Sequence, residues 1–195
     1  STHSTYKGFY LLIDTLKRLK KYDNTILLIF GSEHEDIKKL NIPYVNYSNI
    51  DDDERLSLIY SSADIFLLPS REDNLPNVML ESIACGTPVI AFRAGGATDV
   101  IEDGKSGYLV PTYDTSAFAS KLEEALGDEE SLSKMSLFCI EFAKENFSLK
   151  KQAEAYQKLF RGLCGVNNLN KYFQIDKKTT INIDRLGVLD SAFKQ

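Results

Sequence analysis

Three carboxylates lie in or beside one unusually apolar stretch, "SREDNLPNVMLESIACGTPVIAF", which spans residues 70–92. Glu81 has mainly aliphatic neighbours in sequence, whereas Glu72 and Asp73 belong to the polar run that precedes it. Because burying an unpaired carboxylate is costly, Glu81 is expected to have either a partner or a ligand. A carboxylate offers two acceptor oxygens, which match the vicinal hydroxyls of a ribose.

The spacing around Glu81 predicts a binding site at the start of a helix. Asn77 precedes Glu81 by one helical turn, so both side chains project from the same face. The free N–H groups and the positive end of such a helix suit a phosphate or sugar oxygen, and we expect Asn74, Leu75 and Asn77 to present backbone N–H groups there. The alternatives are a Glu81 paired with a surface lysine and an Asp73 that only shapes a turn.

Composition favours one core with an appended tail. The chain has 195 residues, of which 43% are hydrophobic and 26% charged, and a net charge of −5. The negative charge and the lack of a long basic stripe argue against a nucleic-acid partner but allow a small basic pocket for phosphates. Cysteines 85, 139 and 164 have no metal-ligand spacing. This cysteine usage best fits a reduced, cytoplasmic location. No signal peptide or membrane-spanning run is visible in the sequence.

Short apolar runs alternate with helical patterns along the first 165 residues. The runs are "TILLIFGS" (25–32), "PYVNYSN" (43–49), "DIFLLPS" (64–70), "PVIAF" (88–92) and "GYLV" (107–110). Helices are predicted over 7–22, 33–40, from the capping pair Asp51 and Glu54, over 77–86, from 115, from 128 or 129, and over 148–163. This alternation predicts an α/β fold with one doubly wound, Rossmann-like parallel sheet of about five or six strands.

The chain is expected to divide into a donor-binding domain, residues 1–165, and a C-terminal tail, residues 166–195. In the tail, "YFQID" and "TINID" either pair as a small hairpin or form an adaptable segment. Ligands of open parallel sheets bind beyond the carboxyl ends of the strands. Three loops leave such ends here: "GSEHE", "PSREDNLPN" and "RAGGATD". The abrupt start on a helical pattern suggests a piece of something longer.

These motifs together resemble a known family. From "YKGFYLLIDTLKRL" through "DDDERLSLIYSSADIFLLPSREDNLPNVMLESIACGTPVIAFRAGGATDVIEDGKSGYLV" to the terminal helices, roughly residues 7–160, the chain is similar to the C-terminal, donor-binding half of GT-B glycosyltransferases of family 4. That group is retaining and includes bacterial polysaccharide enzymes. The motifs are specific as a set, although no single one is decisive.

The resemblance implies roles for individual residues. Two acids with seven residues between them frame the family's site; here the second is Glu81, on the ribose, and the first is Asp73, facing the sugar, or Glu72 if the register is shifted by one. Lys7, before Gly8, is implied to bind the diphosphate. Residues 1–3 replace an arginine usual in the family, so either His3 or another basic side chain substitutes, or Lys7 and backbone act alone.

The implied catalytic residues are therefore Lys7 and Asp73. The implied donor-binding residues are Glu81, Asn74, Leu75, Pro76, Asn77, Val78, Gly95 and Gly96. No metal or other cofactor is expected, because positive charge in the cleft stabilises the leaving group. The implied partners are a nucleotide-sugar donor and an N-terminal acceptor-binding domain that this sequence lacks, and peripheral membrane association of the full-length enzyme is compatible with the resemblance.

The resemblance implies transfer of a sugar, with retention, from a nucleotide-diphospho sugar to a glycan or lipid-linked acceptor. The isolated domain is expected to bind donor and to be inactive without the acceptor domain. One alternative is a non-hydrolysing nucleotide-sugar epimerase, which needs acid–base groups facing the sugar, although histidine is nearly absent. The other is a non-catalytic nucleotide-binding module of the flavodoxin or receiver type, which the strand end "LLIFGS" disfavours because it lacks an acidic cluster.

Overall fold

A computed structural model describes residues 5–20, 24–31 and 34–164. The predictions for His3 and for the tail 166–195 therefore lie outside the described residues. In chain order the elements are η1 (Thr5–Lys7), α1 (Phe9–Arg18), β1 (Leu27–Ile29), α2 (Glu35–Lys38), β2 (Tyr44–Asn46), α3 (Asp53–Ser61), β3 (Phe66–Leu68), α4 (Asn77–Ala84), β4 (Val89–Phe92), α5 (Ala97–Val100), β5 (Gly107–Val110), α6 (Thr115–Leu126), α7 (Glu129–Asn146) and α8 (Leu149–Cys164).

The predicted α/β class is confirmed, and every strand pairing is parallel. The expectation of a single sheet is wrong, however, because β1 and β2 form one ladder and β3, β4 and β5 form another. Aromatic rings from three elements gather where β1 and β3 would meet. The ring of Phe30, just after β1, lies 5.3 Å from that of Tyr60 and 6.4 Å from that of Phe66 in β3. These ring contacts, rather than backbone hydrogen bonds, connect the end of β1 with β3.

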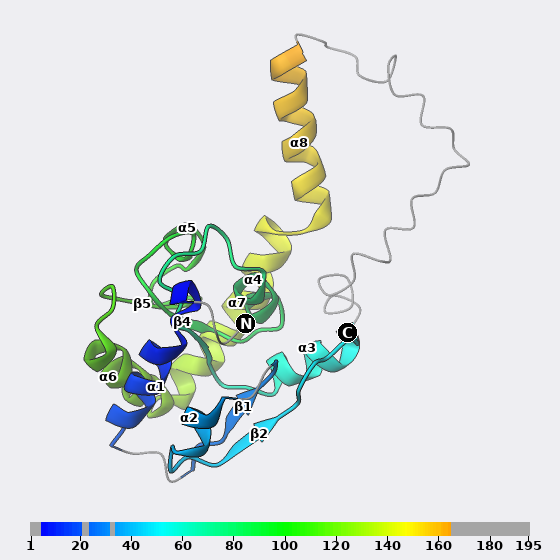
Figure 1. Cartoon of the computed structure of the whole chain (residues 1–195). Helices are drawn as coiled ribbons and strands as arrows, with labels where there is room; N and C mark the ends of the chain where they lie inside the picture. Colours follow the sequence, from blue (N-terminus) through cyan, green and yellow to red (C-terminus); the bar gives the residue numbers. More distant parts are fainter. Residues whose placement is uncertain (1–4, 21–23, 32–33, 165–195) are drawn as a thin grey trace.

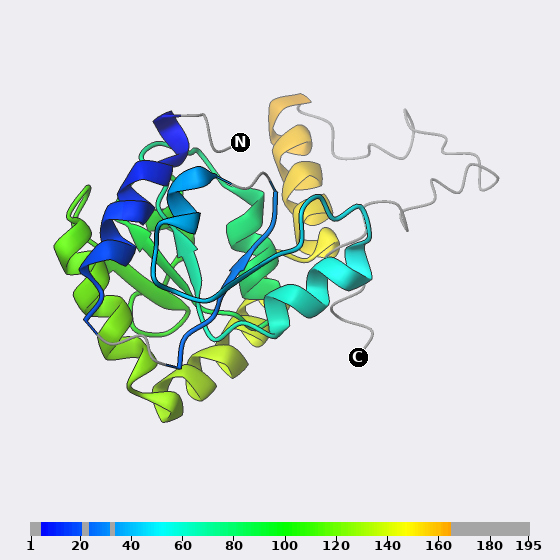
Figure 2. The same ribbon diagram turned by 60° about the horizontal axis from the view of Figure 1, so that its bottom comes forward.

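Helices cover both faces of the three-stranded sheet, as a doubly wound fold requires (Figures 1 and 2). Side chains alternate along β4, as they must along any strand. Ile90 and Phe92 enter the apolar cluster built with α1 and α6, whereas Val89 and Ala91 enter the one built with α4 and α7. The run "PVIAF" is continuously apolar because both of its faces are buried.

Helix starts follow the sequence signals, with one correction. The predicted capping pair of Asp51 and Glu54 is wrong, because Asp52 caps α3 by accepting a hydrogen bond from the backbone N–H of Arg55 at 2.8 Å. The run of three aspartates offers equivalent caps, and the helix begins one residue later than expected. Helix α7 begins at Glu129, one of the two predicted starts, and Asp128 caps it by accepting a hydrogen bond from the backbone N–H of Ser131. The short helix α5 was not predicted.

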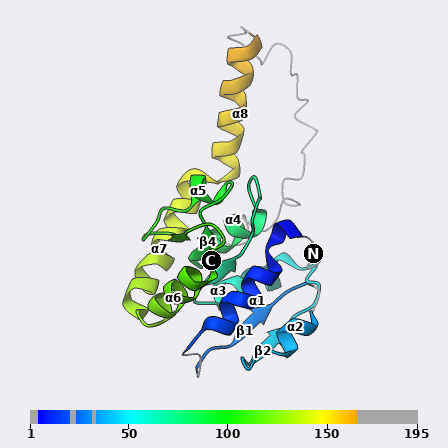
Figure 3. The same ribbon diagram turned by 60° about the vertical axis from the view of Figure 1, so that its left-hand side comes forward.

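Helix α8 projects away from the rest of the chain (Figure 3). It is strongly amphipathic, and its large apolar side chains are exposed: Tyr156, Leu159, Phe160 and Leu163. None of the helices in residues 5–20, 24–31 and 34–164 has the length and apolar character of a membrane-spanning segment.

Candidate functional site

The loop after β3, residues 69–76, is held by the N-terminal segment. The backbone N–H of Arg71 donates to the carbonyl of Tyr6 at 2.8 Å. Gly8 has a φ of 67°, and a Cβ at this position would lie 1.8 Å from the carbonyl oxygen of Pro69. Only glycine allows this close approach. Because Lys7 directly precedes Gly8, the approach also places Lys7 next to the loop.

The two predicted catalytic residues come together. The Nζ atom of Lys7 lies 2.5 Å from Oδ2 of Asp73, although 66 positions separate them in sequence. The lysine side chain is 51% exposed and the aspartate side chain 20%, so the pair faces solvent while Asp73 is the more enclosed member. Glu72, the alternative first acid, is exposed. The structure thus places Asp73, rather than Glu72, beside Lys7, the residue predicted to bind the diphosphate.

The glycine loop after β4 packs directly on the backbone of this acid loop. The N–H of Gly96 donates to the carbonyl of Asp73 at 3.0 Å. A Cβ at Gly95 would lie 2.2 Å from that same oxygen, and one at Gly96 would lie 1.8 Å from the carbonyl oxygen of Asn74. The two glycines therefore let the loops from neighbouring strands touch, which positions Asp73; their contact with a donor stays a prediction.

The start of α4 continues from the acid loop. Pro76 occupies the N-cap position and makes no side-chain hydrogen bond to the first turn. Asn74, Leu75 and Asn77 are exposed, whereas Pro76 is buried and Val78 is half-buried. The N-cap side chain therefore accepts no hydrogen bond from the first turn of α4. The free backbone N–H groups of that turn are candidate donors to a ligand oxygen.

Glu81 lies one helical turn beyond Asn77 on α4. Its Oε2 atom accepts a hydrogen bond of 3.0 Å from the hydroxyl of Tyr60, in α3. Partial burial raises the pKa of Glu81 above its ordinary value, the Tyr60 hydrogen bond lowers it, and the charge of Asp53 raises it. The expected alternative, a pair with a surface lysine, is not found among the described residues. Within its apolar surroundings, Glu81 therefore has a buried tyrosine as its hydrogen-bond partner.

Sequence reasoning missed Arg71, which lies two residues before Asp73. Its guanidinium stacks over the ring of Tyr113, with Cζ 4.8 Å from the centroid. The hydrogen bond to Tyr113 is the main reason why the pKa of Arg71 is raised. Its Nε is buried and has no hydrogen-bond partner within the described chain. No local sequence signal connects these residues, because Tyr113 follows β5 and Arg71 follows β3.

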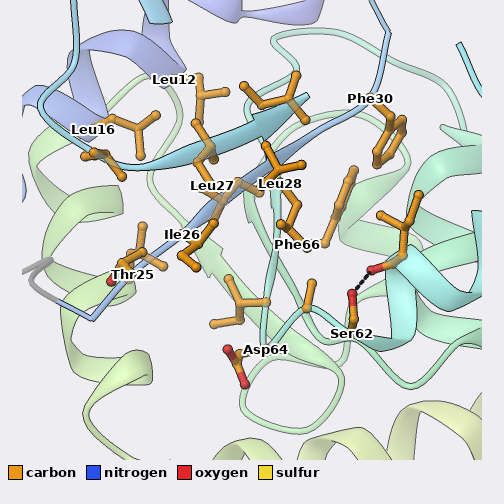
Figure 4. Close-up of a pocket in the computed structure, with 18 of the residues that line it drawn as sticks. Leu12, Leu16, Thr25, Ile26, Leu27, Leu28, Phe30, Ser62, Asp64 and Phe66 are labelled. Atoms are coloured by element: carbon orange, nitrogen blue, oxygen red, sulfur yellow. Dashed lines mark hydrogen bonds between the residues drawn. The ribbon is translucent and has the colours of Figure 1, made fainter. Parts of the chain in front are cut away.

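A cavity of about 710 Å³ lies elsewhere, along the gap between β1 and β3 (Figure 4). Aliphatic and aromatic side chains dominate its walls, among them Leu12, Leu16, Leu27, Phe30 and Phe66. None of the predicted catalytic or donor-binding residues lines it. An apolar wall offers a diphosphate no compensating charge, so we do not place the donor in this cavity.

The part of the chain that the structure describes contains no group of three or more His, Cys, Asp or Glu side chains arranged to hold a metal ion. The expectation that the reaction needs no metal is untested by this and stays a prediction.

Comparison with known proteins identifies the family. Residues 2–141 match the family of glycosyl transferases group 1. The chain belongs to this group 1 family. Among its relatives, a sulfoquinovosyl transferase of Arabidopsis thaliana is 39% identical over 106 residues, which are 52% of this chain and 21% of that protein. A lipopolysaccharide core biosynthesis glycosyltransferase of Rhizobium meliloti is 31% identical over 158 residues, 78% of this chain and 46% of that protein.

Solved glycosyltransferases of the GT-B fold resemble this group 1 chain. Sucrose-phosphate synthase from Thermosynechococcus elongatus superimposes with a TM-score of 0.71 at 25% identity, over 83% of this chain and 43% of that one. An Anabaena protein, HepE, solved with UDP, superimposes with a TM-score of 0.69 at 20% identity, over 85% and 47%. The chain thus spans less than half the length of these proteins, and the resemblance to one half of a GT-B enzyme agrees with that coverage.

Proposed function

We propose that this chain is the donor-binding half of a retaining glycosyltransferase, which transfers a sugar from a nucleotide-diphospho sugar to a glycan or lipid-linked acceptor. The observation that carries the proposal is the contact between Lys7 and Asp73 at the carboxyl end of β3. Membership of group 1 favours glycosyl transfer over an epimerase or a non-catalytic module. The ligand edge of a parallel sheet is where a donor is expected.

Lys7 suits the diphosphate in this arrangement. Its ammonium has three N–H donors, and Asp73 takes only one, so two remain for phosphate oxygens. Asp73 therefore orients the lysine and also lies close to where the sugar attached to the diphosphate would sit. The uncapped first turn of α4 supplies further N–H groups, and Glu81 binds the ribose.

The reaction we propose occurs on one face of the sugar. The bond between the anomeric carbon and the donor's phosphate oxygen breaks, the acceptor oxygen attacks from the same face, and the departing phosphate takes the acceptor's proton. Lys7 and the start of α4 stabilise the negative charge that grows on the leaving diphosphate. In this proposal no protein base and no metal is needed.

The remaining half of such an enzyme would bind the acceptor, and we propose that the apolar stripe of α8 packs against it. The stripe is exposed here, and the chain covers only 43–47% of the structures it resembles. The isolated chain should then bind donor and turn over little. Peripheral membrane association of the full-length enzyme stays a proposal that rests on the resemblance alone.

A panel of nucleotide sugars tests the proposal. We expect at least one of the UDP-, GDP- and CDP-sugars to raise the unfolding temperature of the chain, because a ligand that binds only the folded state stabilises it by mass action. The UDP series comes first, since the Anabaena HepE structures contain UDP and UDP-glucose. No shift with any of the three series at millimolar concentration would contradict the proposed function.

Replacing Lys7 with alanine should weaken binding of a nucleoside diphosphate about tenfold, or ~1.4 kcal/mol, the scale of one lost charge-assisted hydrogen bond. Binding of the nucleoside should change much less, because it has no phosphate. Calorimetric titration of UDP and uridine measures both. Lys17→Ala, an exposed lysine on α1, is the matched control and should leave both affinities unchanged. Equal losses on the two ligands would remove Lys7 from the diphosphate site.

A further inference from the structure

Tyr60 is among the most tightly fixed side chains of the described chain. It is 2% exposed, and its ring meets those of Phe30 and Phe66 edge-on at 5.3 and 5.7 Å. The hydroxyl of Thr87 donates to the Tyr60 carbonyl at 2.5 Å. The phenol hydroxyl of this fixed ring donates to Oε2 of Glu81 at 3.0 Å. Both the ring and the backbone of Tyr60 are therefore anchored independently of its hydroxyl.

We infer that Tyr60 is a positioning residue for the donor: its hydroxyl holds the Glu81 carboxylate in one orientation and leaves the second oxygen, Oε1, to accept from the ribose hydroxyls. The inference rests on the proposed role of Glu81. A glutamate has three rotatable side-chain bonds, and fixing one carboxylate oxygen removes freedom that ribose binding would otherwise have to restrict. Tyr60 does this from α3, outside the acid loop and outside α4.

The charges around Glu81 make the hydroxyl important for a second reason. Burial and the charge of Asp53, from α3, both disfavour the carboxylate form of Glu81. On α4 the thiol of Cys85 has a pKa raised to about 11, so it is neutral and adds no charge near pH 7. Burial also raises the pKa of Tyr60, which therefore keeps its proton and remains a donor. Tyr60 is thus the group on these two helices that favours the charged form of Glu81.

Tyr60→Phe removes the hydroxyl and keeps the ring contacts. It should weaken UDP binding roughly three- to tenfold at neutral pH, the net scale of one hydrogen bond. The pH profile should also move. Because the lost bond lowers the pKa of Glu81, its removal raises that pKa, and the loss of UDP affinity on acidification should begin at a higher pH than in the wild type. Titration calorimetry between pH 5 and pH 8 measures both effects.

Two controls separate positioning from a structural role. Thr87→Val removes the anchor on the Tyr60 carbonyl but not the phenol hydroxyl, so it should lower stability and leave the pH profile in place. In a Glu81→Ala background, which removes the acceptor, Tyr60→Phe should add little to the loss of UDP affinity, because the two residues act through one contact. Additive losses, or an unchanged affinity and pH profile in Tyr60→Phe alone, would overturn the inference.

A carboxyl NMR titration of the free protein distinguishes this failure from failure of the proposed function. The Glu81 carboxyl signal should titrate at higher pH in Tyr60→Phe than in the wild type, with no nucleotide present. An unshifted signal overturns the inference even if UDP binds. If wild-type protein binds none of UDP, GDP and CDP, the donor role of Glu81 and with it that of Tyr60 is refuted, whatever the NMR titration gives.

Discussion

Replacing Glu81 with alanine is expected to weaken UDP and uridine binding alike, about ten- to hundredfold, or ~1.5–3 kcal/mol. This is the range for losing hydrogen bonds to a charged group. The reason is that ribose is common to both ligands, whereas the phosphates are not. The half-buried carboxylate is already fixed by Tyr60 at 3.0 Å, so its loss also leaves the Tyr60 hydroxyl unpaired in a buried place. Titration calorimetry with the two ligands is the measurement.

The acids of the loop provide the controls for this prediction. Glu72→Ala, which removes an exposed carboxylate, should leave UDP binding unchanged. Asp73→Ala should weaken binding of the UDP-sugar more than binding of UDP, because in the proposed arrangement the sugar lies on the Asp73 side of the diphosphate. If Glu81→Ala leaves both UDP and uridine affinities intact, Glu81 is only structural. If Glu72→Ala alone shows the sugar-selective loss, the acid register is shifted by one residue.

Stability should respond to Glu81 in the opposite direction from binding. The folded-state pKa of this group is raised, so between its unfolded and folded values the native state binds more protons than the unfolded state. Stability contributed by this group therefore falls as pH rises through that window. A fold that keeps a charged Glu81 at neutral pH gives up some stability, which is what a ligand-binding carboxylate in an apolar wall is expected to do.

The elements of the fold could be predicted from local pattern because buried strands and amphipathic helices leave distinct periodicities. The "PVIAF" run is a strand buried on both faces, and β4 is that strand. The division into two sheets could not be predicted. It depends on tertiary packing between segments distant in sequence, such as the contacts of Phe30, Tyr60 and Phe66, which no local pattern contains.

The candidate site divides in the same way. The family resemblance predicted that Lys7 and Asp73 belong to one site, but it did not predict their ion pair, since nothing local connects residues 66 positions apart. The helical spacing of Leu56, Ile59, Tyr60 and Ala63 predicts only that Tyr60 belongs to the apolar stripe of its helix. Its ring does belong there, but its hydroxyl serves a different helix, and a periodic pattern contains no information about that second contact. For amphipathic side chains such as tyrosine, a periodic sequence pattern therefore predicts the burial of the ring but not the hydrogen bond of the hydroxyl.

Gly8→Ala is expected to lower the free energy of unfolding by about 3 kcal/mol. Two separable causes contribute. A left-handed conformation costs a residue with a Cβ about 1–2 kcal/mol, and Gly8 has a φ of 67°. The added Cβ would also lie 1.8 Å from the carbonyl oxygen of Pro69, and relieving such an overlap by backbone movement typically costs about 1–3 kcal/mol. Denaturant unfolding of both proteins measures the difference.

Gly104→Ala separates the two causes. Gly104 has a φ of 81°, close to that of Gly8, but nothing lies within 4 Å of a Cβ built there. The control should therefore lose only the conformational part, about 1–2 kcal/mol. The excess loss in Gly8→Ala measures the contact with Pro69. We expect that contact also to bring Lys7 to Asp73. Gly8→Ala should therefore weaken UDP binding, measured without denaturant at a temperature where the variant is still folded. Gly104→Ala should leave UDP binding unchanged. Equal destabilisation by the two substitutions, with UDP affinity intact in both, would show that the close approach of Gly8 to Pro69 does not position the lysine.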